Sequence, residues 1–132
     1  MKRMPDVIIA DTIRPEPEQH EKEIAWILVR HFRCTVEFLQ PNGGYKVKTP
    51  DIVMNGLMWE IKSPKGSSRK NTIESQFKGL KQSRNLIIDC RRTKLAELLV
   101  LSQIEKESLR HRVGKVIVIG KSGNVLDLLS DK

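Results

Sequence analysis

Cysteine is scarce in this sequence: Cys34 and Cys90 are the only two, and they stand far apart along the chain. Neither belongs to a Cys-x-x-Cys pair, so a zinc site is not expected. Both have apolar neighbours in the sequence. We therefore expect the two side chains to pack as reduced thiols rather than to bind a metal.

Aromatic residues and long apolar runs are also lacking. Aromatics make up 5% of the chain, which argues against a surface that stacks successive nucleic-acid bases. No apolar run is long enough to cross a bilayer, and the run from Val7 to Ala10 is too short for a signal peptide. We therefore expect a cytoplasmic protein with no membrane partner.

Positive charge is abundant. The chain has 24 Lys and Arg against 16 Asp and Glu, a formal net charge of +8. A domain this basic usually meets a polyanion, and nucleic acid is the commonest one. The basic residues are not gathered on one amphipathic helix, which disfavours a membrane surface. The length is that of one domain, and the residue pattern predicts an arm over 1–15 and a single domain over 16–132.

Helical and strand-like patterns alternate along the chain. Helices are predicted over residues 17–33, 72–84 and 94–110. Strands are predicted over residues 36–39, 86–89, 116–119 and 125–129, with a hairpin over 51–62. This order predicts an α/β domain with one mixed sheet and helices on its faces.

The hairpin has the most specific pattern in the chain. Asn55-Gly56 separates its two strand-like runs, and both positions tolerate a positive φ. A two-residue turn places Ile52 opposite Trp59. Alternation then produces an apolar face that must be buried and so fixes the register. That face consists of Ile52, Met54, Leu57, Trp59 and Ile61.

Continuing the register places Asp51 opposite Glu60, with about 5 Å between their Cβ atoms. Lys62 follows two residues later on the same face. Like charges that face each other destabilise a sheet, so we expect a divalent cation, Mg²⁺ or Mn²⁺, between Asp51 and Glu60. Such a metal activates water and stabilises charge on phosphate oxygens, and Lys62 would orient or deprotonate that water. The alternative is an exposed salt-bridged triplet without a metal.

The polar loop after the hairpin carries three cations, Lys65, Arg69 and Lys70, separated mostly by small residues. We expect these side chains to bind nucleic acid from a mobile loop. An ordinary solvated turn has the same composition. The sequence leaves both interpretations open.

Pro50-Asp51 followed by Glu60-Ile61-Lys62 resembles the PD-(D/E)xK nuclease superfamily. This resemblance implies a restriction-endonuclease-like mixed sheet flanked by helices, with the metal at the sheet edge. Residues 20 to 92, roughly, resemble the C-terminal tRNA-nuclease domain of contact-dependent inhibition toxins, and similar domains occur in phage and mobile-element proteins. The stretches that carry this second resemblance are Lys48-Thr49-Pro50-Asp51-Ile52, Asn55-Gly56, Trp59-Glu60-Ile61-Lys62-Ser63-Pro64, Asn71-Thr72-Ile73 and Gln82-Ser83-Arg84-Asn85-Leu86-Ile87-Ile88-Asp89.

The resemblance adds further residues to the expected site. It implies a catalytic acid on the first helix, for which Glu21 is the best match and Glu23 the alternative. Either could equally be a surface acid at the positive end of the helix dipole. It also implies that Thr72 and Gln82 lie near the substrate, although Thr72 could instead cap a helix and Gln82 could be an ordinary surface amide.

Three functions follow from these residues. The first is a metal-dependent endonuclease toxin, which would need an immunity protein; the resemblance favours RNA, and tRNA in particular, as its substrate. The second is a DNA-directed nuclease of the same superfamily, such as a junction resolvase or repair nuclease. The third is a non-catalytic basic nucleic-acid-binding module. The presence of Glu60 and Lys62 favours the two nucleases over the third, and nothing in the residues separates RNA from DNA.

Overall fold

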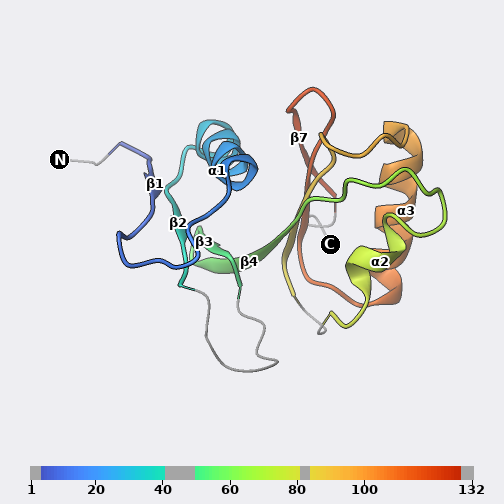
Figure 1. Cartoon of the computed structure of the whole chain (residues 1–132), viewed down its shortest axis with the longest axis horizontal. Coiled ribbons are helices and arrows are strands. Elements are labelled where there is room, and N and C mark those ends of the chain that lie inside the picture. Colours follow the sequence, from blue (N-terminus) through green and yellow to red (C-terminus); the bar gives the residue numbers. More distant parts are fainter. Residues whose placement is uncertain (1–3, 41–49, 81–83, 129–132) are drawn as a thin grey trace. The chain divides into compact units, whose positions relative to one another are not determined.

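The computed structural model describes residues 4–40, 50–80 and 84–128 (Figure 1). The chain divides into two compact units, residues 1–61 and residues 62–132, and each is described by itself. Each unit pairs strands in both parallel and antiparallel directions and carries at least one helix. The mixed α/β class predicted from the sequence is therefore confirmed.

The described residues of the first unit form one helix and four strands, the last of which ends at the boundary with the second unit. Its elements are β1 (Val7–Ile8), α1 (Gln19–Phe32), β2 (Val36–Phe38), β3 (Ile52–Met54) and β4 (Leu57–Lys62). β1 pairs in parallel with β2, and the other neighbours pair antiparallel. The predicted first helix is confirmed to within two residues at its start and one at its end, where Arg33 adopts φ 56°. β1 was not predicted, because a strand of two residues leaves no alternating pattern.

The β3–β4 hairpin confirms the predicted register as far as Ile52 opposite Trp59. Asn55 and Gly56 form the turn with φ values of 53° and 74°, the left-handed conformations that this dipeptide favours. The predicted apolar face is buried at Ile52, Met54 and Trp59 but not at Leu57, which is 36% exposed. Leu57 borders the turn, where the core does not extend.

The second unit is built around a parallel strand pair. Its elements are α2 (Glu74–Phe77), β5 (Leu86–Asp89), α3 (Glu97–Arg110), β6 (Val116–Ile119) and β7 (Val125–Asp127). β5 and β6 run in parallel, with α3 as the connection between them, and β7 pairs antiparallel with β6. Every residue of β5 and β6 is buried. Phe77, Val100 and Ile104 belong to the same core as side chains of these strands.

The predicted helix over 72–84 is wrong in length, because α2 ends at Phe77. Lys78 is extended, with ψ 130°, and Gly79 has φ 74°. A glycine in the left-handed region ends a helix at little steric cost. Phe77 is fully buried, so one turn is enough to place it in the core.

The two cysteines are free thiols, as predicted. Burial, together with a smaller effect of the neighbouring Asp89 carboxylate, raises the pKa of the Cys90 thiol to about 12. Burial also raises the pKa of Cys34, which is only partly buried. Because the thiolate is the reactive form, we expect iodoacetamide at pH 8 to alkylate Cys34 first and Cys90 only after unfolding. Peptide mapping of the alkylated protein checks this order, and fast labelling of Cys90 in the folded protein would contradict it.

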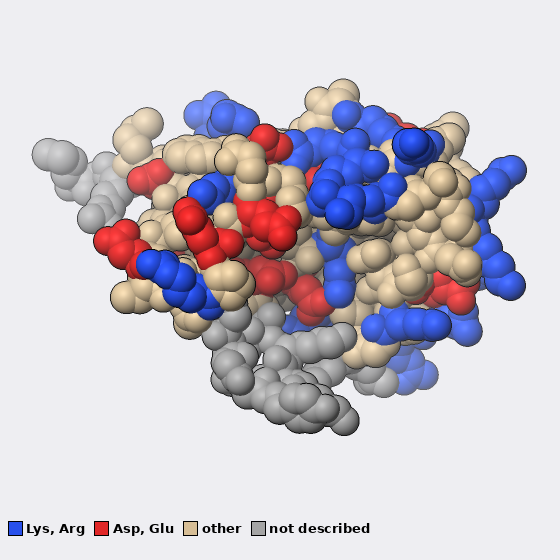
Figure 2. All heavy atoms as spheres, in the orientation of Figure 1, with Lys and Arg blue, Asp and Glu red and all other residues tan. Residues whose placement is uncertain are grey.

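The positive charge of the chain resides in the second unit. Residues 62–132 contain 16 Lys and Arg and 7 Asp and Glu, a net charge of +9, whereas residues 1–61 contain 8 and 9, a net charge of −1. Figure 2 shows this division on one face, with Lys and Arg gathered over the second unit. Within the described residues, no helix has the length and apolar composition needed to cross a membrane.

Candidate functional site

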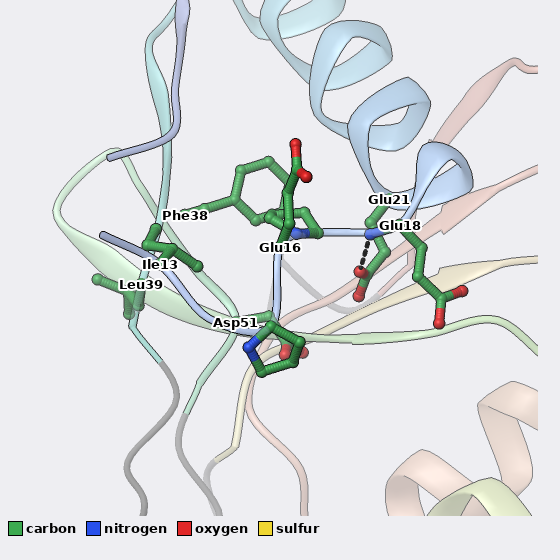
Figure 3. Close-up of a pocket in the computed structure, with 9 residues that line it drawn as sticks. Ile13, Glu16, Glu18, Glu21, Phe38, Leu39 and Asp51 are labelled. Atoms are coloured by element: carbon green, nitrogen blue, oxygen red, sulfur yellow. Dashed lines mark hydrogen bonds between the residues drawn. The ribbon is translucent and has the colours of Figure 1, made fainter. Parts of the chain in front are cut away.

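A pocket of about 280 Å³ in the first unit brings together segments that are distant in sequence (Figure 3). It lies between the chain entering α1 and the strand edge formed by the end of β2 and the start of β3. Its lining residues are Ile13, Pro15, Glu16, Pro17, Glu18, Glu21, Phe38, Leu39 and Asp51. Two of the predicted catalytic acids, Glu21 and Asp51, therefore share one pocket although they come from different elements.

Asp51 sits at an irregularity in the β3–β4 ladder. Its N–H donates to the Trp59 carbonyl at 2.9 Å, although Trp59 is already the registered partner of Ile52. Two consecutive residues thus face one, which is the arrangement of a β-bulge and re-aims a side chain. The register predicted beyond Ile52, with Asp51 directly opposite Glu60, does not appear in the observed pairing.

The re-aimed Asp51 side chain turns onto the neighbouring strand. Its Oδ2 accepts a hydrogen bond of 2.7 Å from the Ile61 N–H. Ile61 stands between Glu60 and Lys62, so the Asp51 carboxylate contacts the backbone of the segment that carries both predicted partners. Glu60 is only 7% exposed, and Lys62 is half-buried at the end of β4. The sharing of one metal by Asp51 and Glu60 stays a prediction.

Glu21 rather than Glu23 lies at this pocket. Glu21 is half-buried, whereas Glu23 is exposed and is not among the lining residues. The Glu21 carboxylate also accepts the Glu18 N–H at 2.8 Å, the bond drawn in Figure 3. An acid that bonds the first free N–H groups of a helix stabilises the helix start, so Glu21 has a structural role in addition to any catalytic one.

Acidic side chains dominate the polar lining of the pocket. Besides Glu21 and Asp51, it includes Glu16 and Glu18. Lys22 pairs with Glu16 at 2.9 Å, and this pairing lowers the pKa of the Glu16 carboxyl. Among the residues that the structure describes, no three His, Cys, Asp or Glu side chains are placed to hold a metal ion. Two carboxylates supplemented by water nevertheless fit Mg²⁺, which commonly binds proteins in that way.

The predicted substrate-binding loop is tethered to α3 and the segment before it. The Gly66 carbonyl accepts the Thr93 hydroxyl at 2.6 Å, and the Arg69 carbonyl accepts the Gln103 amide at 2.6 Å. Two backbone carbonyls of the loop are therefore anchored, and the binding of nucleic acid by its cations stays a prediction. The three cations of the loop, Lys65, Arg69 and Lys70, are exposed.

Two further predicted residues, Thr72 and Gln82, belong to the second unit of the chain. Thr72 is buried at 7% exposure, and its hydroxyl packs against Gly66, where even an added Cβ would come within 2.6 Å of it. Gln82 lies outside the described residues. Conversely, the sequence did not indicate that Ile13 and Glu16 would line the pocket. The one available signal was Ile13 itself, an apolar residue within a polar stretch.

Comparison with known proteins supplies a family and a fold. The model of the contact-dependent growth inhibition CdiA C-terminal domain matches residues 48–125, more than half of the chain. A chain in the solved CdiA-CT/CdiI toxin and immunity complex from Burkholderia pseudomallei superposes with a TM-score of 0.62 at 19% identity, over 93% of this chain and 98% of that chain. No curated protein sequence matches.

Proposed function

This chain belongs to the contact-dependent growth inhibition CdiA C-terminal domain family, and from that membership and the pocket geometry we propose that it is a metal-dependent endonuclease toxin. One observation carries the proposal. The Asp51 carboxylate lies in a pocket with Glu21 and bonds the N–H of Ile61, between Glu60 and Lys62.

Asp51 and Glu60 would hold the metal. Both offer carboxylate oxygens, the ligands that Mg²⁺ and Mn²⁺ prefer. When bound, the ion would lower the pKa of a water molecule and stabilise negative charge on the scissile phosphate. The Ile61 N–H would keep the Asp51 carboxylate in a fixed direction, so that little reorganisation is needed when substrate arrives.

Lys62 and Glu21 would act on the water and the phosphate. The Lys62 ammonium, two residues beyond Glu60 on β4, would orient the attacking water and screen charge that develops on the phosphate. Glu21 would add a second acceptor near Asp51 for water. Its bond to the Glu18 N–H limits the directions in which this carboxylate can point.

RNA is the substrate that we propose, because of the resemblance of residues 20–92 to tRNA-nuclease domains. The second unit, with its net charge of +9, would attract the phosphate backbone. An immunity protein is the proposed protein partner, because the structurally similar chain was solved in a toxin and immunity complex.

Incubation of the purified chain with total RNA and with duplex DNA, each with Mg²⁺, Mn²⁺ or EDTA, tests this proposal. We expect RNA fragments with either metal and none with EDTA, as seen on denaturing gels. Heat-unfolded protein is the control for contaminating nucleases. Cleavage of duplex DNA alone would identify a DNA-directed nuclease instead, and no cleavage of either substrate would overturn the proposal.

A further inference from the structure

The carboxyl ends of β5 and β6 carry a group of cations that the proposed catalytic site does not use. Arg91, Arg92 and Lys94 follow β5, and Lys121 follows β6. Because β5 and β6 are parallel, the two segments meet at one edge of the sheet, where α/β proteins commonly bind ligands. We call these four residues the strand-end cations.

We propose that the strand-end cations bind phosphate groups of the nucleic acid that this chain cleaves, with the Arg91 guanidinium as a fixed contact. The inference rests on the proposed function, which supplies the nucleic acid. It adds a substrate-binding surface that lies wholly within the second unit.

Arg91 is locked in place by a buried carboxylate. Asp89 is fully buried, and its two oxygens accept Nε of Arg91 at 2.9 Å and Nη2 at 3.0 Å. The Arg91 backbone N–H adds a third bond to the same carboxylate at 3.0 Å. The Arg91 side chain is nevertheless 22% exposed. A guanidinium held in this bidentate way loses little freedom when it meets a phosphate, whose geometry suits arginine.

The segments that carry the other cations are bonded to one another. The Thr93 carbonyl accepts the Lys121 ammonium, and the Thr93 hydroxyl donates to Gly66. The Lys121 N–H donates to Oε1 of Glu97 at 2.7 Å, which ties the segment after β6 to the start of α3. The strand-end cations therefore stand on a rigid edge, together with the loop that contains Lys65.

Arg92 and Lys94 are the cleanest probes of this surface. Arg92 is half-buried and Lys94 is exposed, and within the described residues no side-chain hydrogen bond or ion pair holds either. Their removal should therefore change the charge at this edge without breaking a structural contact. Lys78 and Lys115 are exposed cations of the same unit, away from the carboxyl ends of the strands, and offer a matched change of charge.

Binding to a fluorescent RNA is measured in EDTA at several salt concentrations, so that metal-dependent cleavage plays no part. We expect Arg92→Gln/Lys94→Gln to raise Kd on the order of tenfold and to reduce the slope of log affinity against log salt by roughly two, one for each lost phosphate contact. The control Lys78→Gln/Lys115→Gln should retain most of the wild-type slope. Equal slopes for the two double variants would overturn the proposal.

A second variant distinguishes a local contact between Arg91 and phosphate from the general electrostatic attraction of a positively charged protein. Asp89→Asn/Arg91→Gln removes one charge of each sign, so the net charge stays at +8. Weaker RNA binding by this variant, with an unchanged circular dichroism spectrum, would support a local phosphate contact of Arg91. A variant that binds RNA as tightly as the wild-type chain would contradict such a contact.

The same protein preparations distinguish this inference from the proposed function. Wild-type cleavage with Mg²⁺ together with unchanged binding by both variants would refute the inference alone. Weakened binding by the variants together with no cleavage by the wild-type chain would refute the nuclease proposal alone.

Discussion

Replacement of Glu60 by glutamine is expected to lower the rate of Mg²⁺-dependent RNA cleavage by at least about 100-fold. Loss of a group that merely supports a metal ligand costs roughly 10–100-fold, and loss of a proposed ligand should cost at least as much. The glutamine would keep the shape of the Glu60 side chain, which is 7% exposed, so the fold should persist. Initial rates on labelled RNA measure the effect, and circular dichroism measures the fold.

The variant series can identify each acid separately. Asp51→Asn should match Glu60→Gln, because both carboxylates are proposed to hold the same ion. Glu21→Gln tests the first-helix acid, and Glu23→Gln is its matched control, because Glu23 is exposed on the same helix. Wild-type cleavage activity in Glu60→Gln would remove the basis of the proposed site. An equal loss of cleavage activity in Glu23→Gln and Glu21→Gln would show that the position of Glu21 in the pocket has no special role in catalysis.

Arg91→Ala alone is expected to reduce the free energy of unfolding by about 3–5 kcal/mol, the usual effect of removing one partner of a buried ion pair. The reason is Asp89, whose fully buried carboxylate would lose the two guanidinium bonds. Urea unfolding followed by circular dichroism measures the change.

The paired substitution Asp89→Asn/Arg91→Gln is the control for this loss. It leaves no buried charge without its partner, so most of the stability lost in Arg91→Ala should return. An Arg91→Ala variant within about 1 kcal/mol of the wild-type chain, which is the range of exposed ion pairs, would contradict this account of the pair.

Local chemistry was enough to predict the hairpin from the sequence. Asn55-Gly56 permits only a few turn geometries, and burial of Ile52 and Trp59 selects one register among those that remain. The same kind of evidence located α1 and the buried strands β5 and β6. In each case neighbouring residues in the sequence supply both the conformation and the reason for burial.

The features that the sequence did not predict depend on tertiary contacts. The bulge at Asp51 exists because the Asp51 N–H bonds the Trp59 carbonyl and the Asp51 carboxylate bonds the Ile61 N–H. Counting residue pairs outward from the turn assumes a regular ladder, so it cannot predict such a bulge. The loop after β4 is fixed by Thr93 and Gln103, which follow it by more than twenty residues. Periodicity carries no information about partners at that separation.

The pocket illustrates the same limit at the candidate site. Glu21 was the preferred acid of the first helix and Asp51 stood at the start of the predicted hairpin, and both line the pocket. The segment that closes the pocket holds Ile13 and Glu16 and was interpreted partly as an arm. Ile13 is 4% exposed, and this burial depends on how the segment lies against the sheet, which its own residues do not specify.

Anomalous diffraction from crystals of the wild-type chain soaked in Mn²⁺ tests the central claim most directly. We expect one Mn²⁺ peak bound by carboxylate oxygens of both Asp51 and Glu60, and we expect this peak to be absent in crystals of Glu60→Gln. A Mn²⁺ ion that contacts only Glu16 and Glu18, the other two acids that line the pocket, would contradict the proposed metal site. The absence of a peak near Asp51 at a saturating Mn²⁺ concentration would contradict it as well.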